Sequence, residues 1–446
     1  MPNTHRLIIL LGSSGVLAII GLGVTGDTTS GSVFAGLAVA LLATAVTIGV
    51  GGLVAERRTQ TAVSLVPSSP GDRAGHLNDG WVAGLVALAT GVAVQTWFAT
   101  GTVIAGGDIA PPEGTAWIGR LFASWVSTYN LGGPGAQEVQ LPWAAVLWTV
   151  RSFGGSAGLA QRLWYTILVV GAMLAAYALL RLLRLSQVSA AIGALIYMFN
   201  PNSFGTDIYP VDLAAMLLLV GLPVCVLAAA THRWSFTRSI VLIALSAPLL
   251  GYTYQNPPLT GIIGLAFVGS IAIAWAMDGR AARRDATKVV AGGGILLLVT
   301  SAYWLVPSLA QLQNFASASY VPLSGWLWEE GRATLANGLW LNMNIFWGQA
   351  GFFPYANRYA ILPLSLVKFV LPAAAFLAVP LTYWRHAHEH SARKRLVLGS
   401  AGLALFLVLL GTGTRLPGSI IFDPLYHLPL GWLIREPFRF LMVAGL

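Results

Sequence analysis

Long runs of apolar residues recur along almost the whole chain, and they constrain its fold more than any other feature. A helix needs about 20 predominantly apolar residues to cross the hydrocarbon core of a bilayer, and several of the runs approach or exceed that length. The chain is 56% hydrophobic and 9% charged, whereas soluble domains carry roughly 25% charged residues. Segments of about ten residues with alternating hydrophobicity, typical of membrane β-barrels, are absent. The sequence therefore predicts an all-α, polytopic transmembrane helical bundle.

Eleven spans are predicted, followed by the start of a twelfth near residue 438. The fifth is short and is expected to be tilted or half-buried. Because the chain ends part-way into the last apolar run, we expect a longer native protein. The eleven spans are residues 7–24, 33–55, 82–104, 162–183, 187–200, 211–231, 239–255, 259–277, 288–306, 362–384 and 396–413.

Basic residues form short clusters between the apolar runs, and these clusters predict the orientation. Strict alternation through the spans places 16 of the 25 Lys and Arg residues on one side, which the positive-inside rule identifies as cytoplasmic. The long connections 105–161, 307–361 and 414–437 then lie outside. The clustered residues are Arg6, Arg57, Arg58, Arg73, Arg181, Arg184, Arg233, Arg238, Arg280, Arg283, Arg284, Lys288, Arg385, Arg393, Lys394 and Arg395.

The sequence predicts three parts. Residues 1–62 form two leading spans, the first of which lacks a small-x-small cleavage site and is expected to be an uncleaved helix. Residues 63–80 form a cytoplasmic linker rich in Pro, Ser and Gly. Residues 81–446 form the main transmembrane domain, which carries the long external loops.

Composition disfavours several function classes. The net charge of +9 is explained by orientation, so no nucleic-acid partner is expected. The single cysteine, Cys225, excludes an intrachain disulfide and a zinc–cysteine cluster. The chain has no P-loop, Rossmann glycine pattern, H-E-x-x-H motif or nucleophile elbow.

The stretch GGDIAPPEGTAW, residues 106–117, follows the third predicted span at its outer end. Two glycines allow a sharp turn before Asp108, and two prolines restrict the chain after it. Asp108 is either an ordinary solvated loop acid or a general base at the mouth of a membrane-embedded site. The loop that follows contains two apolar, aromatic pieces, residues 116–126 and 141–154, which are predicted to be helices lying along the interface.

Two segments resemble a known family. The stretch STYNLGGPGAQEVQLPWAAVLWTVRSFGGSAGLAQRLWYTILVVG, residues 127–171, resembles the membrane part of the mycobacterial α-(1→3)-arabinofuranosyltransferases, and GALIYMFNPNSFGT, residues 193–206, is similar to their next segments. An early span, an acidic residue and a large external loop with two amphipathic helices also resemble the GT-C superfamily of polyprenyl-phosphate-sugar-dependent membrane glycosyltransferases. The resemblance covers about residues 82–446 and is strongest over 106–183. The two leading spans depart from the family's usual start, where the acidic loop follows the first span.

The resemblance implies a multi-pass enzyme of the cell membrane with an extracytoplasmic active face. It implies inverting transfer of a sugar from a polyprenyl-phosphate donor to a hydroxyl of a cell-envelope glycan or lipid acceptor, with Asp108 as the presumed general base. It favours arabinofuranose, while the sequence leaves the sugar, the acceptor and any cofactor open. Arginines or a divalent cation would take up the phosphate charge as the sugar leaves.

Basic residues on the predicted outer side are candidates for holding the donor phosphate, because arginine binds phosphate in a bidentate way. Arg435 and Arg439 share a face if their segment is helical, although Pro437 predicts a break between them. The alternative for these side chains is snorkelling to lipid headgroups. The candidate phosphate ligands are Arg435, Arg439, Arg358 and Lys368, the last of which lies inside a predicted span.

Two acids and a set of aromatic and amide side chains complete the predicted site. Either Asp207 or Asp212 is a candidate second acid or metal ligand; the alternative is a helix N-terminus, where the dipole favours carboxylates. Aromatic rings and amides on the outer side are candidates for binding acceptor or donor sugars, although an interfacial belt explains the same rings. These candidates are Trp326, Trp340, Trp347, Tyr254, Gln255 and Asn256.

Two other function classes compete with the glycosyltransferase interpretation. A transporter or flippase of lipid-linked substrates is expected to have charged residues in mid-span and paired broken helices, and Lys368 is the main residue of this kind. A non-catalytic scaffold of an envelope complex is the other alternative. Polar residues crowd the predicted outer side, which favours a reaction at the membrane surface. The expected partners are the lipid bilayer, the lipid-linked donor and the envelope acceptor.

Overall fold

The computed structural model describes residues 79–98, 103–104, 125–126, 133–134, 137–199, 209–309, 335, 392–428, 431–434 and 437–444. Helices dominate this part of the chain, which also contains one pair of two-residue strands. The chain divides into two compact units. Unit 1 comprises Met1–Thr115 and Ala145–Leu195, and unit 2 comprises Ala116–Ala144 and Ile196–Leu446.

The described residues include four helical segments that are long and apolar enough to cross a membrane. These segments support the prediction of a membrane protein. α5 and α8 match the predicted spans 162–183 and 211–231 within a few residues. The four are α5 (Ala157–Leu182), α8 (Pro210–Ala230), the consecutive pair α9 (Phe236–Leu245) and α10 (Ala247–Thr253), and α11 (Pro257–Thr300).

In unit 1, α3 (Asp79–Gln95) packs against α5. Gln95 Nε2 donates to Thr166 Oγ1 at 2.8 Å. Nearer the start of α5, the Gln161 side chain accepts from the Ile104 N–H at 2.7 Å and donates to the Ile104 carbonyl at 2.8 Å. All three bonds join the distal end of the α3 segment to the first half of α5, so the two run antiparallel.

The predicted third span, 82–104, is wrong as one continuous helix, because α3 ends at Gln95 and Thr96–Phe98 form a turn. The Thr96 hydroxyl donates to the Ala93 carbonyl at 2.7 Å. Such side-chain bonds compete with the helical ladder. A helix of 17 residues rises only about 26 Å, less than the roughly 30 Å of a bilayer core.

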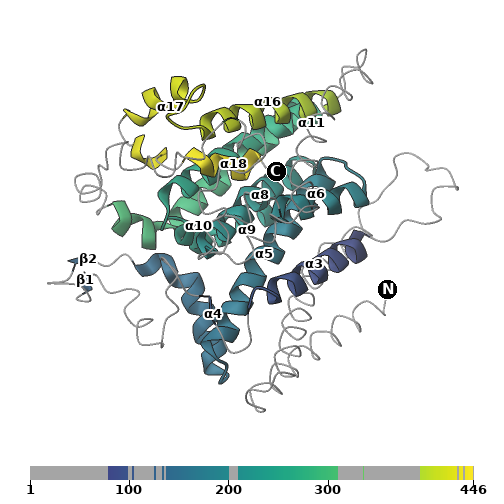
Figure 1. Ribbon diagram of the computed structural model, residues 1–446. Coiled ribbons are helices and arrows are strands. Elements are labelled where there is room, and N and C mark those ends of the chain that lie inside the picture. The colour runs from purple at the N-terminus through teal and green to yellow at the C-terminus, as the bar shows by residue number, and fades with distance from the viewer. Residues whose placement is uncertain are drawn as a thin grey trace, which may run out of the picture. The chain divides into compact units, whose positions relative to one another are not determined.

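α8 is the central helix of unit 2. It is rich in Ala, Leu and Val on every side, and nearly all of its side chains are buried. A helix that is hydrophobic all round is stable only when other elements cover it. α9, α10 and α11 supply that cover (Figure 1).

The predicted spans 259–277 and 288–306 are joined without the expected loop. Residues 257–300 are helical throughout except for a kink at Asp278 and Gly279, where Gly279 has a φ of 76°. Glycine adopts this left-handed conformation without steric cost. The predicted break between the two spans is therefore present at Asp278 and Gly279, and the rest of the predicted connection 278–288 is helical. Its Ala-, Arg- and Lys-rich residues are good helix formers, and Lys288 pairs with Asp285 at 3.3 Å one turn away.

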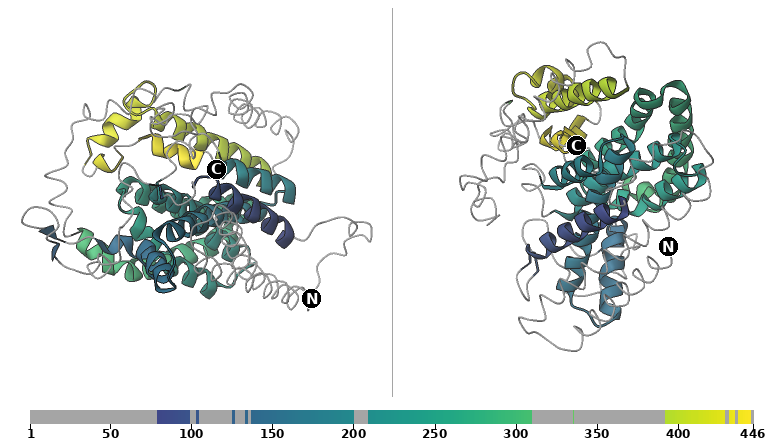
Figure 2. Two further views of the ribbon diagram at one scale, coloured as in Figure 1. Left: turned by 60° about the horizontal axis from the view of Figure 1, so that its bottom comes forward. Right: turned by 90° about the vertical axis from the view of Figure 1, so that its right-hand side faces the viewer.

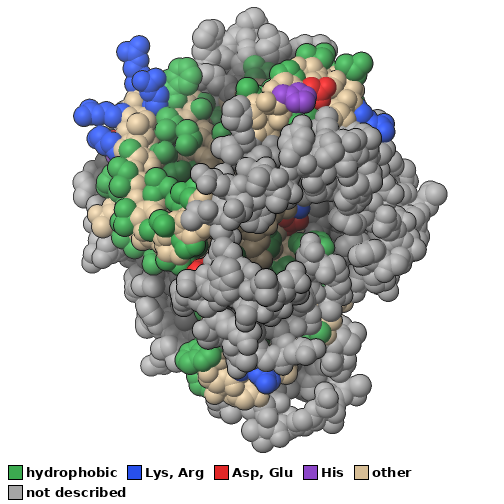
Figure 3. Space-filling view, turned by 90° about the vertical axis from the view of Figure 1, so that its left-hand side faces the viewer, with side chains coloured by type: hydrophobic (Ala, Val, Ile, Leu, Met, Phe, Trp, Pro, Cys, Tyr) green, Lys and Arg blue, Asp and Glu red, His purple; other side chains and the backbone are tan. Residues whose placement is uncertain are grey.

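The surface of α11 carries large apolar side chains that no described residue covers. Leu265 is 70% exposed, Ile295 66% and Val299 64%. Soluble proteins rarely expose extended apolar patches of this kind, whereas lipid contact stabilises them. Figure 3 shows hydrophobic side chains gathered over part of one face, with several Lys and Arg side chains together at its upper left.

The last part of unit 2 begins with α16 (Ala392–Gly411), which agrees with the predicted span 396–413 and contacts α11 and α18 (Figure 2). The apolar run predicted to start near residue 438 forms a 3-10 turn followed by one helical turn. The elements after α16 are α17 (Ser419–Tyr426), η7 (Gly431–Ile434), η8 (Pro437–Phe440) and α18 (Leu441–Ala444).

The described pieces of the connection 105–161, which is predicted to be external, confirm one predicted helix and correct the other. η4 (Gln137–Gln140) leads into α4 (Leu141–Ser152), so the helix predicted at 141–154 is present. β1 (Trp125–Val126) pairs antiparallel with β2 (Gly133–Pro134). The end of the helix predicted at 116–126 is therefore wrong, because the backbone of Trp125 and Val126 pairs with another strand.

α6 (Gln187–Phe199) confirms the short fifth helix. Several predictions lie outside the described residues. They are the spans 7–24, 33–55 and 362–384, and nearly all of the linker 63–80.

Candidate functional site

The helices of unit 2 have a basic end. His232, in the turn between α8 and α9, lies 3.7 Å from the Asp285 carboxylate of α11, so this turn and the kinked region of α11 lie together. Exposed Lys and Arg side chains gather there. The basic end is defined by Arg233, Arg280, Arg283, Arg284 and Lys288.

The opposite end of these helices, here termed the polar end, consists of the starts of α8 and α11, the end of α10, and η4, which contacts α10. The short turns between α8, α9 and α11 require successive helices to run in opposite directions, so the start of α8 and the start of α11 lie at the same end. This end carries the described members of the predicted site.

Asp212 and Arg439 form a buried ion pair at the polar end. Asp212 lies in the first turn of α8, three residues after the N-cap Tyr209, and is only 3% exposed. Arg439 of η8 donates from Nη1 to Asp212 Oδ1 across 227 residues of sequence. The guanidinium and the helix dipole both favour the ionised carboxylate.

The ion pair unites two predicted site residues that the sequence had assigned to different roles. Asp212 was a candidate second acid and Arg439 a candidate phosphate ligand. Their contact also agrees with the alternative interpretation of Asp212 as a carboxylate at a helix N-terminus. The roles of Asp212 as a second acid and of Arg439 as a phosphate ligand stay predictions. Because the two side chains are in contact, a ligand that binds one of them would also affect the other.

The turn between α10 and α11 holds three predicted sugar-binding residues, Tyr254, Gln255 and Asn256. The Tyr254 ring lies 5.3 Å from the Trp304 ring at 42°, and burial raises the pKa of the Tyr254 hydroxyl. Gln255 is exposed, and its Nε2 donates to the Tyr252 carbonyl at 3.1 Å. Asn256 occupies the N-cap of α11 without a side-chain capping bond.

Trp304 fixes this turn against α10. Its Nε1 donates to the Ala247 carbonyl at 3.2 Å. A Cβ at Gly251 would lie 2.8 Å from the indole ring, so glycine is required for this close approach. The polar end thus carries an aromatic side chain, an exposed amide and a buried ion pair on the helices of unit 2.

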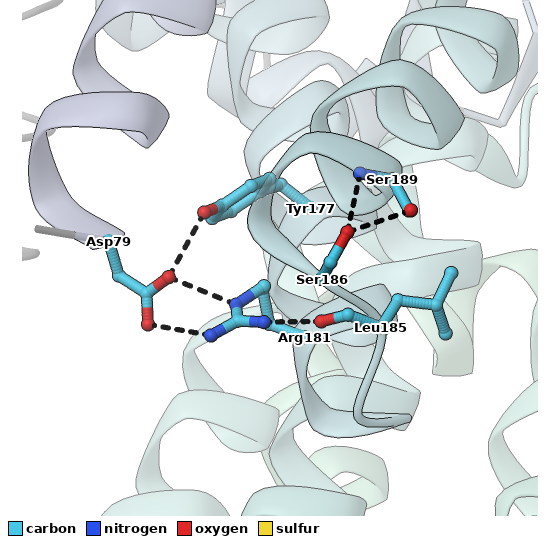
Figure 4. Close-up of polar contacts among 6 residues, drawn as sticks. All are labelled: Asp79, Tyr177, Arg181, Leu185, Ser186 and Ser189. Atoms are coloured by element: carbon cyan, nitrogen blue, oxygen red, sulfur yellow. Dashed lines mark hydrogen bonds and ion pairs between the residues drawn. The ribbon is translucent and has the colours of Figure 1, made fainter. Parts of the chain in front are cut away.

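A second polar cluster, in unit 1, was not predicted from the sequence (Figure 4). Asp79 at the start of α3 lies 3.0 Å from Arg181 Nε and accepts from Arg181 Nη2 at 3.1 Å and from the Tyr177 hydroxyl at 3.3 Å. Arg181 Nη1 also donates to the Leu185 carbonyl. The cluster ties the start of α3 to the end of α5.

The electrostatics of Asp79 are set by opposing effects. Burial raises the pKa of its carboxyl, but hydrogen bonds from Arg181, Gln187 and Tyr177 and the charge of Arg181 outweigh burial and hold the pKa below its usual 3.8. Asp79 is therefore ionised near neutral pH. One indication of this contact was present in the sequence, because Asp79 and Arg181 were both predicted to lie on the cytoplasmic side of the membrane.

The other predicted site residues lie outside the described part of the chain: Asp108, Asp207, Arg358, Arg435, Lys368, Trp326, Trp340 and Trp347. Within the described residues, no group of three or more His, Cys, Asp or Glu side chains is arranged to hold a metal ion. No protein-family model, curated protein or solved structure matches the chain.

Proposed function

We propose that this protein is a GT-C-type membrane glycosyltransferase that moves a sugar from a polyprenyl phosphate to an acceptor on the outer face of the cell membrane. The observation that carries the proposal, beside the sequence resemblance, is the separation of the two ends of unit 2. The buried Asp212–Arg439 pair and the Tyr254–Asn256 turn lie at one end, and the exposed basic residues lie at the other.

The separation of charge gives the proposed orientation. Exposed Lys and Arg residues concentrate on the cytoplasmic side of membrane proteins, so the basic end lies in the cytoplasm and the polar end faces outward. A polyprenyl phosphate in the outer leaflet then places its phosphate and sugar at the level of the polar end, where an acid and arginines are available.

Cysteine labelling is expected to show this orientation. In a Cys225→Ala background, Gln255→Cys at the polar end should react with an impermeant maleimide in intact cells, while Thr287→Cys at the basic end should react only after permeabilisation. Both positions are exposed, so accessibility within the protein is matched. The Cys225→Ala protein alone is the control and should not label. Equal or reversed labelling would contradict the orientation.

The proposed reaction is a single displacement. The Asp108 carboxylate takes the proton of the acceptor hydroxyl while the hydroxyl oxygen bonds to the anomeric carbon. The bond from that carbon to the phosphate oxygen breaks, and the electron pair leaves with the polyprenyl phosphate. Arginine side chains stabilise the charge that develops on the leaving phosphate. Inversion at the anomeric carbon follows from one in-line step.

A reconstituted assay separates this function from its competitors. The purified protein is placed in liposomes that contain a polyprenyl-phosphate sugar with a radiolabelled sugar, and an arabinan oligosaccharide is added outside. A transferase forms radiolabelled oligosaccharide and free polyprenyl phosphate in equal amounts. Movement of the intact lipid-linked sugar between leaflets without cleavage would instead support a flippase. If the membrane-inserted protein shows neither transfer nor movement with any of a panel of donor sugars, the scaffold alternative is supported.

A further inference from the structure

α11 is a hairpin, and residues 278–288 at its turning point are here termed the α11 tip. A Cβ on Gly294 would lie 3.7 Å from the ring of Phe267, so the second half of α11 returns along the first. The chain reverses at the kink that contains Gly279. Asp285 lies within the tip and beside the turn between α8 and α9. The α11 tip therefore belongs to the basic end.

The exposed apolar surface of α11 stops on both sides of the tip. Val268 and Trp275 in the first half and Leu298 in the second are exposed. Tryptophan is enriched where the hydrocarbon meets the headgroups, so Trp275, which is 54% exposed, marks that boundary. The α11 tip begins three residues later and therefore lies at the depth of the lipid headgroups. Its exposed basic side chains are Arg280, Arg283, Arg284 and Lys288.

Three of these cations repeat every four residues. Arg280, Arg284 and Lys288 therefore line one face of the helix, with about 5–6 Å between neighbouring Cβ atoms. Like charges at this spacing destabilise a helix, and a bound anion would offset their repulsion. Asp285 contacts Lys288 at 3.3 Å and His232 at 3.7 Å. Neither contact involves Arg280 or Arg284, and both arginine side chains are exposed.

This surface fits an anionic phospholipid better than a free anion. Arginine binds phosphate in a bidentate way, and each Lys or Arg beside an anionic leaflet strengthens the attraction roughly fivefold. A free phosphate ion would contact the cations alone. A phospholipid would place its phosphate on Arg280 and Arg284 and its acyl chains along the exposed apolar side chains of α11, which begin at Trp275.

We infer that the α11 tip binds the headgroup phosphate of an anionic phospholipid in the leaflet that borders the basic end, with Arg280 and Arg284 as the ligands. The site lies at the end of the unit 2 helices opposite the polar end. Its role is to hold the hairpin at a defined depth in the bilayer, and its test does not depend on sugar transfer.

The test titrates phosphatidylglycerol into the purified protein in micelles of a neutral detergent. A fluorophore on Thr287→Cys, in the Cys225→Ala background, reports binding, because Thr287 is exposed within the tip. Micelles remove any effect of the basic residues on orientation in the membrane. Phosphatidylglycerol should change the fluorescence saturably, whereas phosphatidylcholine, which is neutral, and inorganic phosphate, which lacks acyl chains, should not.

Two pairs of substitutions locate the binding surface. Arg280→Gln combined with Arg284→Gln should weaken the affinity for phosphatidylglycerol about 25-fold, or roughly fivefold for each arginine. Arg151→Gln combined with Arg415→Gln removes two exposed arginines outside the tip and should leave the affinity unchanged. Circular dichroism of each variant in the same micelles checks that the helices are retained.

Three results would overturn the inference. The first is an equal response to phosphatidylcholine, and the second is an equal affinity in the two variant pairs. The third is saturation by inorganic phosphate that the glutamine pair at the tip abolishes, since this would show a site for a free anion.

Ionic strength provides a measurement that needs no variant of the arginines. Raising it from about 0.1 M to about 1 M shortens the Debye length from about 10 Å to about 3 Å, so binding of phosphatidylglycerol by exposed arginines should weaken. An affinity that does not change with salt would also refute the site, even if the glutamine pair failed to fold.

Discussion

Replacement of Asp108 by Asn is expected to give a folded, membrane-inserted protein that binds the lipid-linked donor but has lost nearly all sugar transfer. The carboxamide keeps the size of the side chain and removes the oxygen that would accept the proton. General base catalysis contributes about 10²- to 10⁴-fold to a rate, so kcat should fall by that factor. Donor binding should persist, because the substitution leaves the proposed phosphate ligands unchanged.

The measurement is single-turnover release of polyprenyl phosphate, with donor affinity determined separately by equilibrium binding. Asp285→Asn removes a carboxylate from the basic end and serves as the matched control. If Asp108→Asn retains more than about a third of wild-type transfer, well short of the expected loss, the base is another residue. Asp207→Asn would then be the next variant to measure.

The second large effect is expected at the Asp212–Arg439 pair. Asp212→Asn removes the anion that the Arg439 guanidinium contacts, and Arg439→Met removes the cation that the Asp212 carboxylate contacts. Removing one partner of a buried ion pair costs about 3–5 kcal/mol, whereas replacing both partners is often close to neutral. Each single variant should therefore be strongly destabilised, and the double variant should be more stable than either.

Denaturant titration of the protein in detergent micelles measures these differences as a double-mutant cycle. Arg415→Ala is the control: Arg415 is an exposed arginine in the same unit, and its loss should change stability by less than about 0.5 kcal/mol. Strictly additive effects of the two single changes would mean that the pair contributes no coupling and that the contact is incidental.

Wild type, the two single variants and the double variant also test whether Arg439 binds the donor. If Arg439 also holds the donor phosphate, the double variant should fold yet bind the lipid donor more weakly than wild type. If the pair is purely structural, the double variant should bind the donor as wild type does. The stability cycle and the binding measurement thus separate the two interpretations of Asp212 and Arg439.

The sequence by itself determined which segments become apolar helices. α5, α6, α8 and α16 lie where the apolar runs predicted them, because the length and composition of a run decide whether it forms a helix that avoids water. The charge pattern also placed Arg233 and the Arg280–Lys288 cluster together, and the structure shows them at one end of unit 2. The positions of apolar runs and of basic clusters depend only on the residues of each segment, so both can be predicted without knowing which other segments pack against it.

Helix ends and junctions were less predictable from the sequence. Residues 278–288 were predicted as a charged connection between two spans, and the break is present at Asp278 and Gly279, but the residues that follow it are helical. Charge shows that a segment avoids hydrocarbon, but it does not distinguish a polar helix from a loop. Likewise, the end of the predicted helix at 116–126 forms a strand, because pairing of Trp125 with Pro134 is a contact between separate segments.

Only the tertiary structure decided which polar groups meet. Asp79 pairs with Arg181, and Asp212 pairs with Arg439. Each pair joins residues 100 or more positions apart, and many alternative partners with the same chemistry exist along the chain. Hydropathy and charge patterns specify the helix and the side of the membrane, but the packing of buried faces fixes rotation and register. That packing selects the partner of each buried charge.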